Sequence, residues 1–260
     1  MFLANKDPDA DLDIMCKARD NLRKIEPKNV VLISTIAVYA DSKGKYEEDT
    51  LLCPQLSPYG YNRLLLEQWV REDFPYALII RLPALYGIGL KKNFLYDLQT
   101  ITPSMLVPSK YEELALTSNL VKNAYTLSEN GFYKLNSRVD GGQLKQYFQK
   151  SSFNALSFTD SRSRYQFYNL SRLWNDISLA LKERLLYLNI TPSPLSAADV
   201  YEAVTGAADW NNELEKVPFD YDLRSHYAEV LGGGKDYLCS AEAVLDDICR
   251  YMKPYYNGIT

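Results

Sequence analysis

Residues 30–35 read VVLIST, residues 57–67 read SPYGYNRLLLE and residues 76–83 read YALIIRLP. The runs at 30–33 and 76–81 are short and apolar, which favours strands buried in a parallel sheet. Between them, Ser57-Pro58 is an N-cap with proline at the first helical position, and leucines at helical spacing follow. A strand, a helix over 57–72 and a second strand predict the crossover unit of a parallel sheet.

The rest of the chain extends this α/β pattern in both directions. Residues 11–25 have the spacing of a helix that Pro27 ends, and residues 40–56 read as a loop. The pattern is less regular from Gly89 to residue 163. The later elements that we expect are a helix at 110–128, a turn at Gly141-Gly142, strands at 165–168 and 185–190, and helices from a Ser171 cap to Leu181, from a Ser196 cap over 197–204, and over 241–252.

Composition excludes several classes of protein. The 260 residues are 47% hydrophobic and 24% charged, as in an ordinary globular chain. No apolar run approaches the roughly 20 residues that span a bilayer, so no membrane partner is expected. The net charge of −4 gives no field for a nucleic-acid backbone. Four cysteines without a C-x-x-C pair, and a start without signal-peptide character, favour a reduced, cytoplasmic setting.

Three apparent metal or phosphate motifs fail on spacing or number. His226 is the only histidine, which removes His-based triads and most His-containing metal sites, so we expect it to be a packed or surface residue. The alternating aspartates from Asp7 to Asp13 lack the glycine and glutamate of a calcium loop and more simply favour a helix N-terminus. The glycines before Lys235 lack a phosphate-loop frame. No metal site is therefore predicted.

A pair of residues on the 57–72 helix carries the most specific chemistry. Tyr59 and Arg63 are four residues apart, which puts them on one helical face. Using a tyrosine as a base near pH 7 means stabilising its phenolate by about 4 kcal/mol. One cation at ~4–5 Å supplies roughly 3–4 kcal/mol at an effective dielectric constant of about 20. With a hydroxyl from Thr35 at the strand end, the pair could move a proton to or from an alcohol or carbonyl.

These residues carry a resemblance. ISTIAVY at 33–39, SPYGYNRLLLE at 57–67 and RLPALYGIG at 81–89 resemble the extended short-chain dehydrogenase/reductase family, the NAD-dependent epimerase/dehydratase group. Residues 164–173 and 188–204 resemble later segments of that family. The resemblance implies an incomplete Rossmann-type parallel sheet with a small C-terminal substrate lobe. Residues 1–95 would be the remaining dinucleotide-binding domain and residues 96–260 the lobe with elements that return to the main sheet.

The resemblance also implies roles for individual residues. Thr35 would bond the sugar hydroxyl, Tyr59 would transfer the proton, and Arg63 stands where the family has a lysine. An arginine keeps that charge but is bulkier and planar, which puts the ribose contact in doubt. The other implied contacts are with NAD or NADP through Ala4, Tyr59, Arg63, Leu82 and Pro83, with Ala4 ending a strand, and with a nucleotide-linked sugar through Ser34, Lys92, Asn93 and Arg164.

Two functions remain open from the sequence. The first is an NAD(P)-dependent oxidoreductase or epimerase of nucleotide-linked sugars; dehydration is not expected, because Ile36 and Ala37 stand where the family's dehydratases carry an Asp-Glu pair. The second is a non-catalytic binding or scaffold protein of the same fold, favoured by Arg63 and by the lack of a glycine-rich turn, since the first glycine is Gly44 and the chain reads as N-terminally truncated. The resemblance further implies a homodimer through helices 11–25 and 57–72.

Overall fold

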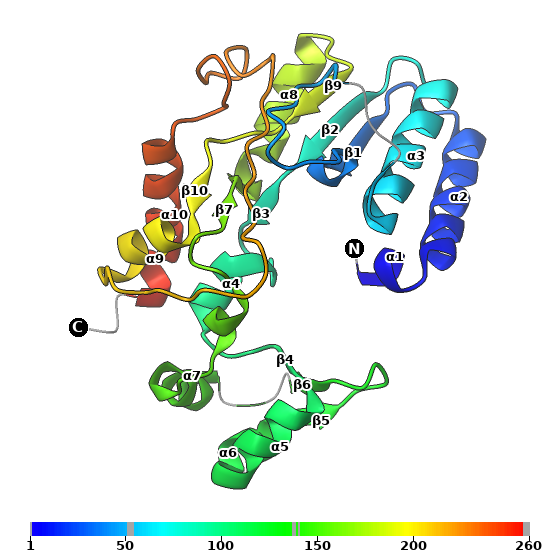
Figure 1. Ribbon diagram of the computed structural model, residues 1–260. Coiled ribbons are helices and arrows are strands. Elements are labelled where there is room, and N and C mark those ends of the chain that lie inside the picture. Colours follow the sequence, from blue (N-terminus) through cyan, green and yellow to red (C-terminus); the bar gives the residue numbers. More distant parts are fainter. Residues whose placement is uncertain (1, 51–54, 137–138, 140, 257–260) are drawn as a thin grey trace.

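The computed structural model describes residues 2–50, 55–136, 139 and 141–256. At its centre is a parallel sheet with the strand order β1-β2-β9 (Figure 1). These strands are β1 (Val31–Thr35), β2 (Leu78–Leu82) and β9 (Tyr187–Asn189). Thr35 lies opposite Leu82 and Arg81 lies opposite Asn189, so the carboxyl ends of the three strands meet at one edge of the sheet.

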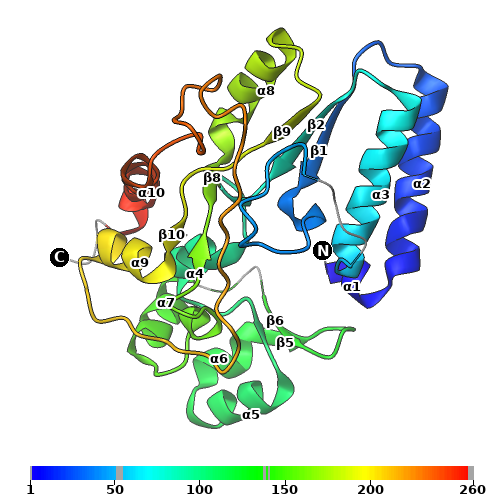
Figure 2. The same ribbon diagram turned by 45° about the horizontal axis from the view of Figure 1, so that its top comes forward.

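Helices cover both faces of this sheet because successive side chains of a strand point in opposite directions. Leu78 and Ile80 of β2 pack with Ile177 of α8 (Leu173–Lys182). Arg81 instead meets Glu67 of α3 (Pro58–Asp73) on the other face. Helix α2 (Pro8–Ile25) runs beside α3, as Figures 1 and 2 both show. The predicted strand, helix and parallel strand are therefore confirmed.

Strand β1 is less buried than its apolar sequence predicts. Among the described residues it pairs only with β2, so it forms an edge of the sheet. Ile33 is 45% exposed although Ile80, directly opposite, is fully buried. The cluster of side chains that buries Ile80 includes residues of α8 but not Ile33. The prediction of a fully buried strand is thus wrong at Ile33, because burial depends on what packs over the strand and not on the strand alone.

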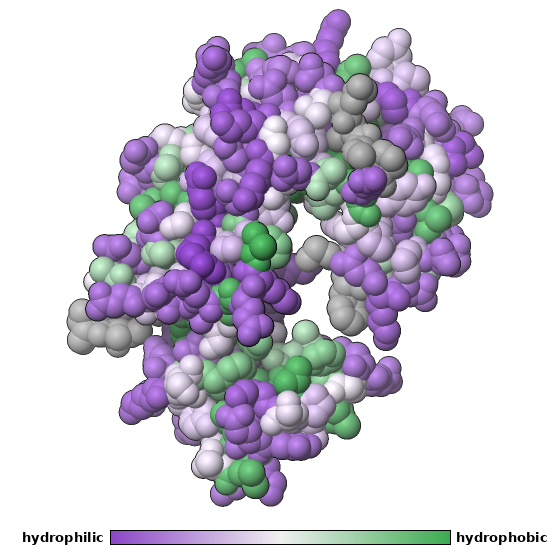
Figure 3. Space-filling model, viewed as in Figure 1, coloured by the Kyte–Doolittle hydropathy of each residue, from purple (hydrophilic) through white to green (hydrophobic). Residues whose placement is uncertain are grey.

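The rest of the chain builds a second layer of short strand pairs and a lobe. Strand β3 (Ala84–Tyr86) pairs in parallel with β8 (Phe167–Asn169), and β10 (Leu195–Ser196) pairs antiparallel with β7 (Arg164–Tyr165). The lobe contains an antiparallel sheet of β4 (Met105–Leu106), β6 (Tyr133–Leu135) and β5 (Tyr125–Leu127). Figure 3 shows a hollow between this lobe and the part of the molecule built from α1 and α3.

The remaining helices surround these sheets. They are α1 (Phe2–Lys6), α4 (Asn93–Thr100), α5 (Pro108–Thr117), α6 (Asn119–Ala124), α7 (Gly141–Lys150), α9 (Ala197–Thr205) and α10 (Ala241–Tyr256), with 3-10 turns η1 (Ile36–Val38), η2 (Ala155–Phe158) and η3 (Leu170–Arg172). Ser196 caps α9 by accepting a hydrogen bond from the Asp199 amide at 3.0 Å, as predicted. Within the described ranges, no helix is long and apolar enough to cross a membrane.

Four sequence predictions are corrected by tertiary contacts. The helix expected at 110–128 is divided, because Ser118 ends α5 and caps α6, and residues 125–127 then pair with β6. The glycine pair at 141–142 begins α7, whose Leu144 and Phe148 are buried in the lobe. The strand at 165–168 forms two short strands. The side chain of Asn169, rather than Ser171, caps the turn before α8.

Candidate active site

The candidate site lies at the carboxyl ends of β1 and β2, where parallel sheets bind ligands. Thr35 ends β1, and its Oγ1 accepts a hydrogen bond from the Ala37 amide at 3.2 Å, which starts the turn η1. Leu82 is buried at the end of β2, and Pro83 follows it. The carboxyl ends of the strands thus present one hydroxyl and one proline-terminated backbone segment at a common edge.

Gly60 brings the start of α3 against this edge. A Cβ atom built on Gly60 would lie 2.2 Å from the Ala37 carbonyl oxygen, so only glycine allows this approach. Ser57 caps the helix by accepting from the Gly60 amide at 3.2 Å, and Pro58 occupies the first helical position, as predicted. Tyr59 is therefore held in the first turn of a helix that packs directly on the turn after Thr35. In Figure 1 this end of α3 lies toward the region in which Figure 3, from the same side, shows the hollow.

Arg63 lies beside Tyr59 but is also bound to a carboxylate. Its Cζ is 4.9 Å from the centre of the Tyr59 ring, a cation–π contact. Its Nη1 and Nη2 donate to the two carboxylate oxygens of Asp11 at 3.2 and 3.1 Å. Burial opposes ionisation of Asp11, but bonds from Asn62 and Arg63 outweigh it and lower the pKa of that carboxyl. The sequence argument treated Arg63 as a cation without a partner. In the structure, Asp11 compensates much of the Arg63 charge.

A buried ion pair that the sequence reasoning missed supports the same edge. Arg81 donates to Glu67 at 2.8 Å, with exposed side-chain fractions of 3% and 2%. Ser34 donates its hydroxyl proton to Glu67 at 2.6 Å, and Arg81 also donates to the Tyr39 hydroxyl at 2.7 Å. The predicted substrate contact Ser34 is therefore buried and bonded inside the protein. The signal for this ion pair in the sequence is Arg81 at the end of the apolar run YALIIR, because a buried guanidinium needs a carboxylate partner.

The end of β9 adds a second buried polar group. Asn189 is fully buried and donates from Nδ2 to the Tyr39 hydroxyl at 2.7 Å. The backbone N–H of Asn189 donates to the buried carboxylate of Glu48 at 2.8 Å. Tyr39 donates to the Glu47 carbonyl at 3.0 Å. These contacts bind the loop at 41–50 to the carboxyl end of the sheet, and nothing local in the sequence reveals them.

The predicted cofactor contact Ala4 lies in a helix beside the start of α3. Ala4 is buried in helix α1, so the prediction that it ends a strand is wrong; a helix satisfies these backbone groups locally, and no described strand pairs with the outer edge of β1. The neighbouring Asn5 accepts a hydrogen bond from the Tyr59 amide at 3.3 Å. Helix α1 thus meets the start of α3 rather than extending the sheet.

The predicted diphosphate contacts are spread over two elements. Asn93 has φ 63°, donates to the Leu85 carbonyl at 2.7 Å and accepts from the Leu95 amide at 3.0 Å, so both ends of its amide serve the backbone. Lys92 is exposed beside it. Arg164 is exposed on β7 and forms a 3.5 Å ion pair with Asp220. Across the described ranges, no hydrogen bond or ion pair joins these three residues to one another or to Tyr59.

The fold and the strand-end hydroxyl define the class: an α/β protein of the Rossmann type, with Thr35 at the carboxyl edge of its parallel sheet and a Y-x-x-x-R helix packed beside it. Residues 3–104 match the family model of the RmlD substrate binding domain. A search of curated protein sequences gives no match.

Solved structures with this fold include extended short-chain dehydrogenase/reductases. UDP-glucuronic acid 4-epimerase from Bacillus cereus, in complex with UDP-glucuronic acid and NAD, is 17% identical with a TM-score of 0.56, over 94% of this chain and 68% of that one. For dTDP-4-dehydrorhamnose reductase from Yersinia enterocolitica the values are 16%, 0.52, 93% and 71%. For L-threonine 3-dehydrogenase from Trypanosoma brucei they are 16%, 0.52, 98% and 73%. The predicted fold class and the resemblance to this family are confirmed: the chain has the fold of the extended short-chain dehydrogenase/reductases.

Proposed function

We propose that this chain is an NAD(P)-dependent oxidoreductase or epimerase of nucleotide-linked sugars, with Tyr59 as its proton-transfer group. The observation that carries the proposal is the contact of Gly60 with Ala37, which holds Tyr59 in the helical turn that packs beside the strand end of Thr35. Several similar solved structures are of nucleotide-sugar epimerases and reductases, and that of UDP-glucuronic acid 4-epimerase is a complex with NAD. In this proposal residues 1–95 hold the cofactor and residues 96–260 form the substrate lobe.

The residues present fit the reacting end of a nicotinamide cofactor better than its diphosphate end. The hydroxyl of Thr35 and the backbone after Leu82 lie at the strand ends, and the helical turn that carries Tyr59 packs beside them through Gly60. No glycine precedes Gly44, so the pyrophosphate would need contacts other than a glycine-rich turn in residues 1–43. A bound nicotinamide would supply or accept the hydride. Thr35 would orient the sugar oxygen through its hydroxyl proton, and Tyr59 would give or take the proton on that oxygen.

The alternative is a binding or scaffold protein of the same fold, and a specific contact favours it. Arg63 donates two of its five N–H groups to Asp11, which fixes its guanidinium against α2 and leaves fewer donors for a ribose. In the catalytic proposal Arg63 acts by its charge over the Tyr59 ring alone. We also propose that α2 and α3 form the interface of a homodimer, which sedimentation of the chain as a dimer would support and sedimentation as a monomer would contradict.

The test compares Tyr59→Phe with Tyr61→Phe. Tyr61 lies on the same helix, is 43% exposed and serves as the matched control. We expect NAD or NADP binding in titration calorimetry of all three proteins, and turnover of UDP-sugars or dTDP-sugars in the original chain and Tyr61→Phe only. Equal turnover in Tyr59→Phe would remove Tyr59 from the mechanism. Absence of nicotinamide binding, with nucleotide-sugar binding retained, would favour the scaffold alternative.

A further inference from the structure

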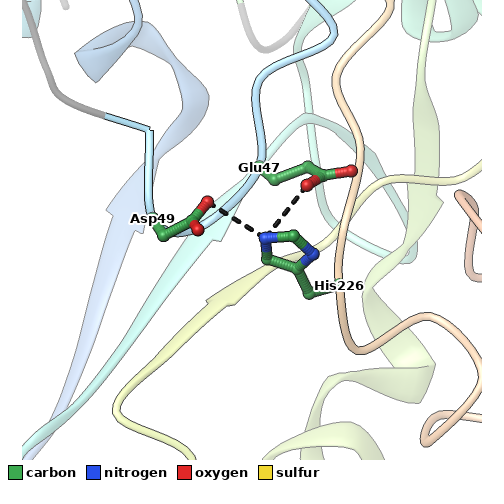
Figure 4. Close-up of side chains that lie close together, drawn as sticks. All are labelled: Glu47, Asp49 and His226. Carbon is green, nitrogen blue, oxygen red and sulfur yellow. Dashed lines mark hydrogen bonds and ion pairs between the residues drawn. The ribbon is translucent and has the colours of Figure 1, made fainter.

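Three metal-ligating side chains converge outside the candidate active site. Glu47 and Asp49 lie in the loop after η1, and His226 lies 177 residues beyond Asp49 in the chain. The Nε2 atom of His226 is 2.9 Å from Glu47 Oε2 and 3.0 Å from Asp49 Oδ1. Figure 4 shows both carboxylates pointing at this one ring nitrogen. The three ligand atoms all lie within 4.8 Å of one another.

The donor types and spacings suit a divalent ion. Imidazole nitrogen and carboxylate oxygen are ligands of first-row ions such as Mn²⁺, Co²⁺ and Zn²⁺, and imidazole disfavours Mg²⁺ and Ca²⁺. In an octahedral site with bonds of about 2.1 Å, neighbouring ligand atoms are about 3 Å apart. The 2.9 and 3.0 Å separations are of this size. One ion could therefore contact the imidazole and both carboxylates with little movement of the side chains.

Charge at the cluster also favours a cation. The side chains of Glu47 and Asp49 form no ion pair with Lys or Arg anywhere in the described ranges, and their one recorded partner is His226. The exposed fractions are 32% for Glu47, 44% for His226 and 78% for Asp49, so water can complete the coordination of an ion. With a neutral imidazole, the two carboxylates carry two negative charges that a divalent ion would neutralise.

Glu48 holds the two halves of the cluster in place independently of any ion. Its carboxylate is buried and accepts from the Asn189 amide at 2.8 Å and from the His226 amide at 2.9 Å. Ser225 donates its hydroxyl proton to the same carboxylate. The loop of Glu47 and Asp49 is thereby fixed against the backbone of His226, so the three side chains are held together before any ion binds.

We propose that Glu47, Asp49 and His226 bind one divalent first-row transition ion, which joins the loop at 41–50 to the segment at 225–231. The site is structural in this proposal and contains no residue of the candidate active site. It differs from the sequence prediction of no metal site: in this proposal one histidine suffices because two carboxylates from a distant loop complete the set.

The single histidine makes the test specific. In a tag-free chain labelled with ¹⁵N-histidine, the only imidazole resonances are those of His226. We expect titration with Zn²⁺ to move the Nε2 resonance until one equivalent has been added. Mn²⁺, followed by the loss of its free electron paramagnetic resonance signal, should also bind at one equivalent. His226→Ala should abolish this binding.

Conservative variants show whether ion binding depends on these two carboxylates or on the negative charge of the surface in general. Glu47→Gln and Asp49→Asn should each weaken Mn²⁺ binding by at least about tenfold, the loss that even outer-shell partners of a metal produce. Glu129→Gln, at an exposed carboxylate elsewhere, should bind as the original chain does. Circular dichroism establishes that each variant is folded. An unmoved Nε2 resonance at excess Zn²⁺, or equal Mn²⁺ binding by folded His226→Ala, would overturn the proposal and leave the proposed enzymatic function unaffected.

Discussion

Replacing Glu67 with Gln should destabilise the protein far more than the loss of an ordinary ion pair. The side chains of Glu67 and Arg81 are 2% and 3% exposed, so Arg81 would keep its charge in a site shielded from solvent after losing its carboxylate partner. Breaking a buried pair from one side costs about 3–5 kcal/mol. For a chain of this size each kcal/mol lowers the melting temperature by about 2–4 °C, which gives a decrease of roughly 6–20 °C.

Two further variants show whether the unpaired charge is the cause. Glu72→Gln, on the same helix, removes an exposed carboxylate 3.8 Å from Arg19 and should cost at most about 1 kcal/mol. The double change of Glu67→Leu with Arg81→Met removes both charges and should recover most of the lost stability, because apolar replacements of buried ion pairs are often neutral. Urea and thermal unfolding followed by circular dichroism measure all three. If Glu67→Gln and Glu72→Gln lost the same amount of stability, the unpaired buried charge of Arg81 would not be the cause.

Three other changes test packing and electrostatics, two of them at the candidate active site and one in α4. Gly60→Ala should lower stability by about 1–3 kcal/mol in urea unfolding, because its methyl group would overlap the Ala37 carbonyl oxygen. Burial raises the pKa of Asp97 to about 7, so between about pH 4 and 7 the folded chain keeps a proton that the unfolded chain has released. Stability should therefore fall by up to about 4 kcal/mol as pH rises through that window, and Asp97→Asn should remove the fall. Asp11→Asn removes the carboxylate that compensates Arg63, so the acid limb of the pH profile of turnover should move to lower pH.

Matched variants accompany each of these changes. Gly234→Ala places its methyl group in open space and should leave stability unchanged. Asp209→Asn removes an exposed carboxylate and should not change the pH dependence of stability. Asp9→Asn also removes an exposed carboxylate and should not change the pH profile of turnover. A Gly60→Ala protein as stable as Gly234→Ala would mean that the contact with Ala37 is looser than described. A fall in stability from pH 5 to 8 that persists in Asp97→Asn would assign it to another group.

Elements governed by local chemistry were predictable from the sequence. The helix α3 begins where Ser57 and Pro58 indicate, because an N-cap and a first-turn proline act within a few residues. Elements whose ends depend on distant partners were not. Residues 125–127 leave the helical pattern because β6 offers them backbone hydrogen bonds, and Gly141 begins a helix because Leu144 and Phe148 find a core to enter. Neither partner is visible in the local sequence.

The same distinction applies to the chemistry of the site. The spacing of Tyr59 and Arg63 is a property of one helix, so the sequence predicts their contact and the structure contains it. The charge that reaches Tyr59 is not local, because Asp11 lies on another helix and binds the same guanidinium. An argument from spacing counts a whole positive charge, but the packing of α2 on α3 leaves Tyr59 beside a nearly neutral pair. Whether this chain transfers protons therefore depends on how strongly Asp11 holds Arg63, and the Asp11→Asn variant measures that contact directly.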